Sequence, residues 1–121
     1  METTGKPLVL IAEDDSSNFK YLEVLLRRDY DILWAKNGRE AVTMALENNP
    51  VFVLMDVKMP LMTGIEAVTE IKQSKPQLPI IMQTAFAFDS DKELAMNAGA
   101  DAYLTKPILV NKLKETIAKF V

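Results

Sequence analysis

The sequence contains no cysteine and no histidine, and these two absences exclude several kinds of chemistry. Without cysteine there is no disulfide framework, no thiol nucleophile and no thiolate zinc site. Without histidine the chain lacks the side chain that most often serves as a general base near neutral pH and as a ligand for transition metals. Any chemistry at this protein must therefore use carboxylates, lysines, hydroxyl groups and a hard metal ion.

Glycine is also scarce and occurs only at positions 5, 38, 64 and 99, so neither G-x-G-x-x-G nor a P-loop can be formed. No signal peptide is visible, and no apolar run approaches the roughly 18 residues of a membrane span. The net charge of −3 provides no basic surface for nucleic acid or for an anionic membrane. We therefore expect a cytoplasmic domain that binds neither nucleic acid nor membranes directly.

The chain has 121 residues, of which 49% are hydrophobic, and this suits one domain with a single sizeable core. We expect a polar tail over residues 1–6 and one domain over residues 7–121. Apolar runs predict five strands, at residues 8–12, 31–35, 51–55, 78–84 and 102–104. Helical spacing predicts five helices: 16–28 behind serine caps, a segment containing Ala41 to Leu46, 64–74, a segment ending at Gly99, and a segment from Val110 to Phe120.

Most of these strands are apolar throughout, which indicates burial on both faces of a parallel sheet covered by helices on each side. We expect an α/β fold, a doubly wound five-stranded parallel sheet with strand order 2-1-3-4-5 and five helices. In such sheets ligands bind beyond the carboxyl ends of the strands, where the strand order reverses. The first and third strands would therefore flank the site.

Polar residues follow four of the five strands, and the second strand ends with nothing comparable. They are Glu13, Asp14 and Asp15 after the first strand, Asp56 after the third, Thr84 at the end of the fourth and Lys106 after the fifth. Two carboxylates about 5 Å apart repel by roughly 3 kcal/mol at an effective dielectric near 20. Such a cluster would take up protons or recruit positive charge. Lys106 supplies one charge, and Mg2+ suits the remaining oxygen ligands.

Each of these residues also has an ordinary structural interpretation. Asp15 is as well explained as a helix N-cap as by a role in the site. Glu13 alone could be a solvated loop acid, Lys106 a surface lysine and Thr84 an ordinary residue at a strand end. Tyr103 could be a half-buried aromatic. The functional hypothesis therefore depends on the whole set.

Four motifs together resemble the response-regulator receiver domain of two-component signalling: LIAEDD, LMDVKMPLMTG, IIMQTAFA and GADAYLTKP. They occur in order at strand ends, and the resemblance extends over about residues 7–121. The wording is most similar to receivers of hybrid histidine kinases. The resemblance implies a phosphorelay in which Asp56 takes a phosphoryl group from a phosphohistidine on a partner histidine kinase or histidine phosphotransfer domain.

The resemblance also implies how the site is divided between a metal and the phosphoryl group. Asp14, Asp56 and the backbone carbonyl of Lys58 would hold Mg2+, with Glu13 acting largely through water. No enzymatic activity is implied for the isolated domain beyond its own phosphorylation and dephosphorylation, although a parent chain could be a histidine kinase.

The phosphoryl oxygens would be contacted by Lys106, the hydroxyl of Thr84 and the backbone N–H of Ala85. The bond before Pro107 would be cis. After phosphorylation Thr84 would move toward the phosphoryl group and Tyr103 would fill the vacated space. The face formed by the fourth helix, fifth strand and fifth helix would then bind a downstream effector.

Phe86 lies two residues after Thr84, at a position that the resemblance places over the site. We predict that its bulk hinders the attacking water, so that the acyl phosphate is longer-lived than in a Phe86→Glu variant. Equal lifetimes of the two proteins would contradict this prediction.

Other functions remain open at this stage. A magnesium-dependent aspartyl-phosphate phosphatase usually has a second acid two residues after its nucleophile, where this chain has Lys58. A flavin-binding protein would need a phosphate-binding loop after the first strand, where this chain has three acids that would repel phosphate. A receiver-like domain that signals without phosphate would not need the intact set of site residues. The chain could come from a free-standing regulator or from a larger protein.

Overall fold

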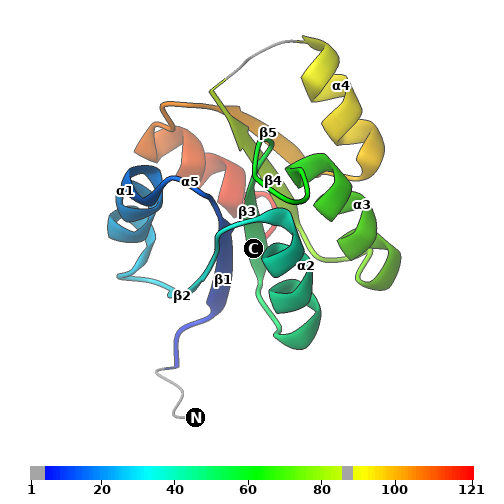
Figure 1. Ribbon diagram of the computed structural model, residues 1–121. Helices are drawn as coiled ribbons and strands as arrows, with labels where there is room; N and C mark the ends of the chain where they lie inside the picture. Colours follow the sequence, from blue (N-terminus) through cyan, green and yellow to red (C-terminus); the bar gives the residue numbers. More distant parts are fainter. Residues whose placement is uncertain (1–4, 86–88) are drawn as a thin grey trace.

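The computed structural model describes residues 5–85 and 89–121, in which strands and helices alternate along the chain (Figure 1). The strands are β1 (Leu8–Ala12), β2 (Asp31–Ala35), β3 (Phe52–Asp56), β4 (Ile80–Thr84) and β5 (Ala102–Thr105). The helices are α1 (Ser16–Leu26), α2 (Gly38–Glu47), α3 (Gly64–Ser74), α4 (Asp89–Ala98) and α5 (Val110–Ala118). The expected number and order of elements in these residues are confirmed.

The strands form one parallel sheet in the order β2-β1-β3-β4-β5, as predicted. Helices α1 and α5 cover one face, and α2, α3 and α4 cover the other (Figure 1). Strand order reverses between β1 and β3, which are adjacent in the sheet although α1, β2 and α2 separate them in the chain. The carboxyl ends of β1 and β3 therefore lie side by side.

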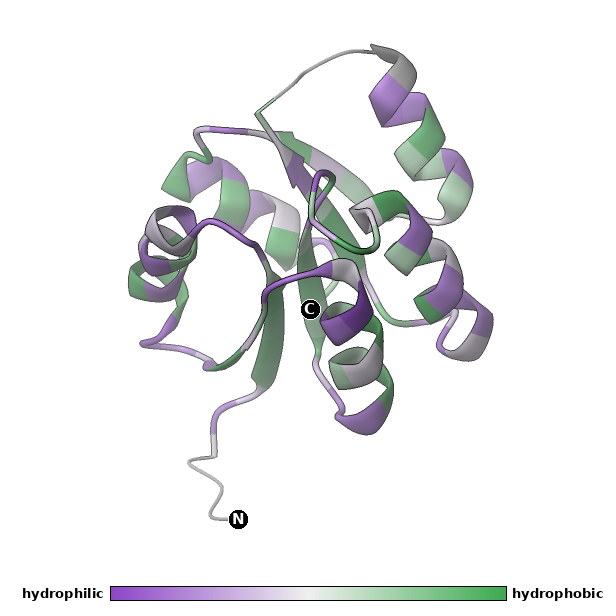
Figure 2. Cartoon of the chain, in the orientation of Figure 1, coloured by the Kyte–Doolittle hydropathy of each residue, from purple (hydrophilic) through white to green (hydrophobic). Residues whose placement is uncertain are grey.

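The core occupies both faces of the sheet because alternate residues of each strand point to opposite sides. In β1, Leu10 and Ala12 belong to the cluster under α2, α3 and α4, whereas Val9 and Ile11 belong to the cluster under α1 and α5. All four side chains are fully buried. The strands are consequently apolar along their whole length (Figure 2), and polar residues are left to their carboxyl ends.

Three predicted boundaries differ from the structure. The third strand extends to Asp56 instead of stopping one residue earlier, and the fourth begins at Ile80. The first helix ends at Leu26, followed by Arg27 as its C-cap. Asp56 pairs in register with Gln83 of β4, so it is part of the sheet and not of the loop that follows.

The predicted serine caps of the first helix are wrong, because the N-cap is Asp15. Its carboxylate accepts hydrogen bonds from the backbone N–H groups of Ser17 at 3.4 Å and Asn18 at 3.2 Å. These are two of the donors that a helix N-terminus leaves without an intrahelical partner. Of the two interpretations of Asp15, the structure shows the helix cap. Among the described residues no helix is long and apolar enough to cross a membrane.

Candidate functional site

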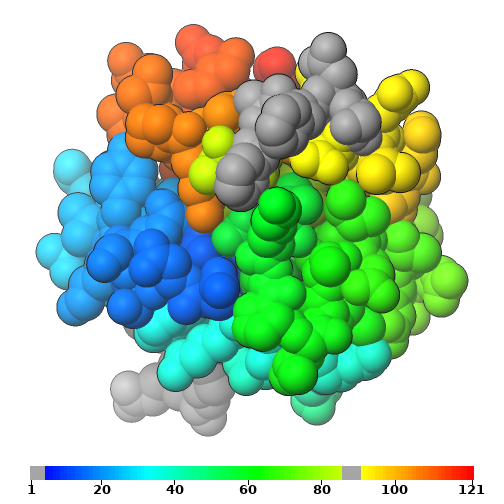
Figure 3. Space-filling model, turned by 45° about the horizontal axis from the view of Figure 1, so that its top comes forward, coloured from blue at the N-terminus to red at the C-terminus, as the bar shows by residue number. Residues whose placement is uncertain are grey.

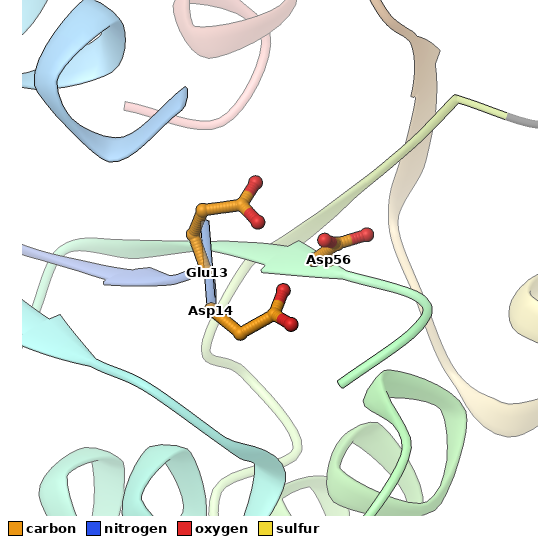
Figure 4. A group of neighbouring side chains, drawn as sticks. All are labelled: Glu13, Asp14 and Asp56. Carbon is orange, nitrogen blue, oxygen red and sulfur yellow. The ribbon is translucent and has the colours of Figure 1, made fainter. Parts of the chain in front are cut away.

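An acidic cluster lies at the carboxyl ends of β1 and β3. Glu13 and Asp14 follow β1, Asp56 ends β3, and each offers a carboxylate oxygen within 4.8 Å of the other two (Figure 4). Glu13 and Asp56 are buried, whereas Asp14 is exposed. Figure 3 looks onto this edge of the molecule, where the blue β1–α1 segment, the green β3–α3 loop and the orange β5–α5 segment meet. The predicted gathering of these three acids is confirmed.

Lys106, which follows β5, forms ion pairs with both buried acids. Its Nζ lies 2.8 Å from Oε1 of Glu13 and 3.2 Å from Oδ2 of Asp56. The lysine backbone is fixed by a 2.7 Å hydrogen bond from its N–H to the carbonyl of Thr84. The peptide bond between Lys106 and Pro107 is cis, as predicted.

Glu13 is held in its charged form by the groups around it. Burial acts to raise its pKa, but hydrogen bonds involving Lys106, Asp56, the backbone of Asp15 and the side chain of Asn18 outweigh burial, so the pKa is lowered. Oε1 accepts from both Lys106 and Asn18, and Oε2 accepts from the Asp15 backbone N–H at 3.2 Å. The carboxylate of Glu13 is therefore satisfied within the protein.

Asp56 is perturbed in the opposite direction. Burial and the neighbouring Glu13 carboxylate raise its pKa to about 7, against the opposing effect of Lys106. Besides Lys106, it accepts a long hydrogen bond from the backbone N–H of Lys58, at 3.4 Å. Without a cation, Asp56 therefore retains a proton close to neutral pH. The pKa of Lys106 is raised, because its two acidic partners outweigh the effect of burial.

The donor set fits a hard divalent cation. Three carboxylates and one ammonium group leave a formal charge of −2, and oxygen ligands of this kind suit Mg2+. Asp14 is exposed and can offer an oxygen without leaving the solvent, while Asp56 provides an oxygen from the buried side. The cluster is consistent with Mg2+ binding and relieves its own repulsion when a cation is present.

The remaining predicted site residues lie around this cluster. Thr84 is the buried last residue of β4, and Ala85 follows it at the surface. Lys58 is exposed in the β3–α3 loop. Tyr103 is half-buried in β5; burial and Asp91 raise its pKa, and a hydrogen bond with Thr84 partly opposes them. Phe86 lies outside the described residues.

The β3–α3 loop returns against Asp56 because a glycine allows it to do so. The backbone N–H of Gly64 donates to the carbonyl of Val57 at 2.8 Å. A Cβ atom on Gly64 would lie 1.9 Å from the backbone carbonyl oxygen of Asp56, well inside contact distance. Only glycine fits this close approach, and the packing fixes the start of α3 against the end of β3.

Sequence reasoning missed three residues that support Glu13. The indole of Trp34 in β2 donates to the backbone carbonyl of Glu13 at 2.7 Å, so the second strand does contribute to the site. Asn18 of α1 donates to the Glu13 carboxylate and, at 3.4 Å, to the side-chain oxygen of Gln83. A glutamine inside the otherwise apolar run LPIIMQT was the signal that could have identified Gln83.

Comparisons with known proteins agree with this geometry. Residues 9–118 match the response regulator receiver domain family. Over 116 residues the chain is 34% identical to the polar-differentiation response regulator DivK of Brucella anthropi, and the match covers 93% of this chain and 94% of that protein.

Two solved structures are similar over nearly the whole chain. One is the receiver domain of the sensor histidine kinase PA1611 of Pseudomonas aeruginosa, with a magnesium ion coordinated in its active site cleft; the TM-score is 0.89, the identity 29%, and 96% of this chain and 98% of that chain are covered. The other is the receiver domain of Ssk1 of Saccharomyces cerevisiae in complex with the histidine phosphotransfer protein Ypd1, with a TM-score of 0.87, 31% identity, and coverage of 98% of this chain and 91% of that chain.

Proposed function

This chain belongs to the response regulator receiver domain family, and from that membership we propose which of its residues carry out its phosphorylation. Receiver domains are phosphorylated in a Mg2+-dependent reaction during two-component signalling and interact with histidine kinases or phosphotransfer proteins. The acidic pocket of Glu13, Asp14 and Asp56 serves this reaction here. The domain is a signalling component and not an enzyme that turns over other substrates.

Asp56 is the proposed phosphoacceptor. The observation that carries this proposal is its position: a carboxylate at the end of a central strand, 3.2 Å from Lys106 and less well supplied with hydrogen-bond donors than Glu13. An oxygen of Asp56 would attack the phosphorus of a phosphohistidine. The P–N bond would break as the P–O bond forms, and the imidazole would leave with the electron pair. The donor must be on a partner, because this chain has no histidine.

The other site residues neutralise charge and position the reacting groups, which is most of what phosphoryl transfer requires. Asp14, Asp56 and the Lys58 carbonyl would hold Mg2+, with Glu13 acting largely through water. When bound, the ion supplies positive charge to the phosphoryl oxygens. Lys106, the Thr84 hydroxyl and the Ala85 backbone N–H would contact those oxygens.

We propose that the signal leaves the site through Thr84 and Tyr103. Their hydrogen bond joins β4 to the half-buried ring on β5. Movement of Thr84 toward the phosphoryl group would release this contact and let Tyr103 turn inward. The population would then shift toward a form in which the α4-β5-α5 face binds a downstream effector.

The partners follow from the same chemistry. We expect a histidine kinase or a histidine phosphotransfer domain as donor, and the Ssk1–Ypd1 complex shows a similar receiver with such a protein. Because the phosphohistidine derives from ATP, we place the exchange in the cytoplasm. The net charge of −3 supports a protein partner and not nucleic acid or an anionic membrane.

Two forms of the parent protein are supported by different observations. The match to nearly the full length of DivK supports a free-standing response regulator. The similarity to the PA1611 receiver supports a receiver joined to a histidine kinase, acting as a phosphate relay or sink. The mass of the endogenous polypeptide, measured with an antibody against residues 5–121, distinguishes the two forms.

The phosphoacceptor is tested by incubating the protein with MgCl2 and acetyl phosphate and measuring its intact mass. We expect the addition of one phosphoryl group, located on Asp56 by peptide mapping after reductive trapping of the acyl phosphate. Asp56→Asn should remain unmodified, and the exposed-acid control Glu47→Gln should behave like the wild type. Modification of the Asp56→Asn variant in the same peptide, or modification that persists after chelation of the metal, would contradict the proposal.

A further inference from the structure

Gln83 is a fully buried glutamine directly below the acidic cluster. It follows Ile81 on the face of β4 that is covered by α1 and α5, and it pairs in register with the buried Leu104 of β5. Its Nε2 has no hydrogen-bond partner among the described residues. A buried donor without a partner is unfavourable, and an apolar side chain would suit these neighbours better. Its presence calls for a reason other than packing.

The side-chain oxygen of Gln83 points to that reason. Oε1 accepts a hydrogen bond from Nδ2 of Asn18 at 3.4 Å, and the same Nδ2 donates to Oε1 of Glu13. Asn18 therefore faces two acceptors, one on β4 and one after β1. This arrangement selects the orientation of the Asn18 amide in which its NH2 group, and not its carbonyl, faces the carboxylate.

Glu13 is the common point of these contacts. Its Oε1 also accepts from Lys106 at 2.8 Å, and its Oε2 accepts from the Asp15 backbone N–H at 3.2 Å. A rotation of the Glu13 carboxylate would move the ammonium group that Asp56 also uses. The neutral donor on Asn18 fixes Glu13 without adding charge to the site.

We propose that Asn18 and Gln83 are positioning residues that hold Glu13, and through it Lys106, in the geometry needed for magnesium binding and phosphorylation. Gln83 acts through Asn18, and Asn18 acts through Glu13. The functional part of this inference rests on the proposed phosphorylation of Asp56, whereas the contacts themselves do not. Hydrogen-bond partners that orient metal-binding carboxylates change metal affinity or activity by about 10- to 100-fold when they are removed.

The hydrogen bonds are tested first by NMR, without metal or phosphodonor. The side-chain NH2 signals of Asn18 should show one strongly deshielded proton, because it donates to a carboxylate. Gln83→Met should shift these signals and Glu13→Gln should shift them further. An Asn18 amide with the shifts of a solvated side chain in the wild-type protein would overturn the inference, whatever the outcome of phosphorylation experiments.

The functional consequence is tested by titration with MgCl2, followed by calorimetry and by the fluorescence of Trp34, the only tryptophan in the chain. Asn18→Ala should weaken Mg2+ binding by about tenfold and slow phosphorylation by acetyl phosphate. Gln83→Met should weaken binding less, and it should have no further effect in the Asn18→Ala background. The exposed-residue controls Asn97→Ala and Gln77→Met should match the wild type.

Thermal stability separates a positioning role from a structural one. Gln83→Met removes a buried donor without a partner, so its melting temperature in the absence of Mg2+ should equal or exceed that of the wild type while its Mg2+ affinity falls. A loss of stability and affinity together, or unchanged affinity in both single variants, would overturn the positioning role. If Asp56 is not phosphorylated at all, the NMR and Mg2+ measurements still test the contacts and the metal geometry separately.

Discussion

At the scale of single residues, two acids in one cluster are perturbed in opposite directions. Glu13 is surrounded by donors, namely the Lys106 ammonium, the Asn18 amide and a backbone N–H, and stays charged. Asp56 lies beside that charge with fewer donors, and its pKa rises to about 7. The proposed nucleophile is thus the acid whose charge the protein alone satisfies least, and it has the most to gain from a bound cation.

The raised pKa of Asp56 predicts that the metal-free protein loses stability as pH rises. In the folded state Asp56 keeps its proton up to about pH 7, whereas the unfolded value is 3.8. Between these values the folded state binds more protons, so the free energy of unfolding falls as pH increases. The lowered pKa of Glu13 acts in the opposite direction, but only below its usual 4.5. Urea unfolding in EDTA should therefore show lower stability at pH 8 than at pH 5.5.

Asp56→Asn provides the control for this pH dependence, since asparagine keeps the shape of the side chain and does not ionise. The variant should be more stable than the wild type at pH 8 without metal, by an amount on the order of 2 kcal/mol, and the difference should shrink toward pH 5. A wild-type stability that is flat or rising across this range would show that Asp56 is already ionised.

Removing Lys106 should destabilise the metal-free protein, because it leaves buried Glu13 without its ammonium partner. Lys106→Met is expected to lower the free energy of unfolding by about 3 kcal/mol at pH 8. Adding Glu13→Gln should recover much of that loss, since the buried charge is then absent. A double variant as unstable as the sum of the two single variants would mean that the 2.8 Å contact contributes no coupling.

At the scale of elements, the site depends on how closely the β3–α3 loop can approach the strand end. Gly64 packs against the Asp56 carbonyl, and Gly38 at the start of α2 packs against the backbone of Met62 in the same loop. A Cβ on Gly38 would lie 2.1 Å from the Met62 carbonyl oxygen. Two helices thus hold one loop by backbone contact, and the loop carries Lys58 next to Asp56.

Gly64→Ala tests this close packing. The added methyl group would lie 1.9 Å from the Asp56 carbonyl oxygen, and that atom belongs to the backbone and cannot turn away. We expect a loss of about 2–4 kcal/mol in stability and weaker Mg2+ binding, as α3 and the end of β3 move apart. Gly5→Ala is the control, because a Cβ there meets nothing within 4 Å. Wild-type stability and Mg2+ affinity in Gly64→Ala would show that the loop has room to spare.

Prediction from sequence succeeded for the elements because their signals are local. Apolar runs identified the strands, and the alternation with helices gave the parallel sheet and its order. The cap of α1 was assigned to serine, because the choice between Asp15 and Ser16 depends on backbone angles that the sequence does not state. The amide contacts of Asn18 and Gln83 join residues 65 positions apart, so only the fold could bring them together.

At the scale of the whole molecule, the fold collects charges that are distant in sequence and would repel one another in isolation. Glu13, Asp56 and Lys106 come from the ends of three different strands, and their backbone positions are fixed by one continuous sheet. The free energy of folding must therefore overcome part of the repulsion in the cluster. Any cation that binds only the folded arrangement returns that free energy to the stability of the domain.

Magnesium should therefore stabilise the whole domain, and more strongly at higher pH. Ligand binding to the folded state adds RT ln(1 + [L]/Kd), which is about 2.7 kcal/mol at a concentration 100 times Kd. For a domain of this size the corresponding rise in melting temperature is roughly 10 °C. The rise should be larger at pH 8 than at pH 6, because the cation competes with the proton on Asp56, whose pKa is about 7.

Differential scanning calorimetry with MgCl2 and then with EDTA measures this effect, and Asp14→Asn is its most direct control. Asp14 is exposed, so its loss should change the metal-free stability little while it removes most of the Mg2+-dependent rise. A rise of equal size in Asp14→Asn would mean that the ion binds elsewhere. A rise that is independent of pH would mean that no proton leaves the cluster when the ion enters, and the charge balance inferred for Glu13, Asp56 and Lys106 would be wrong.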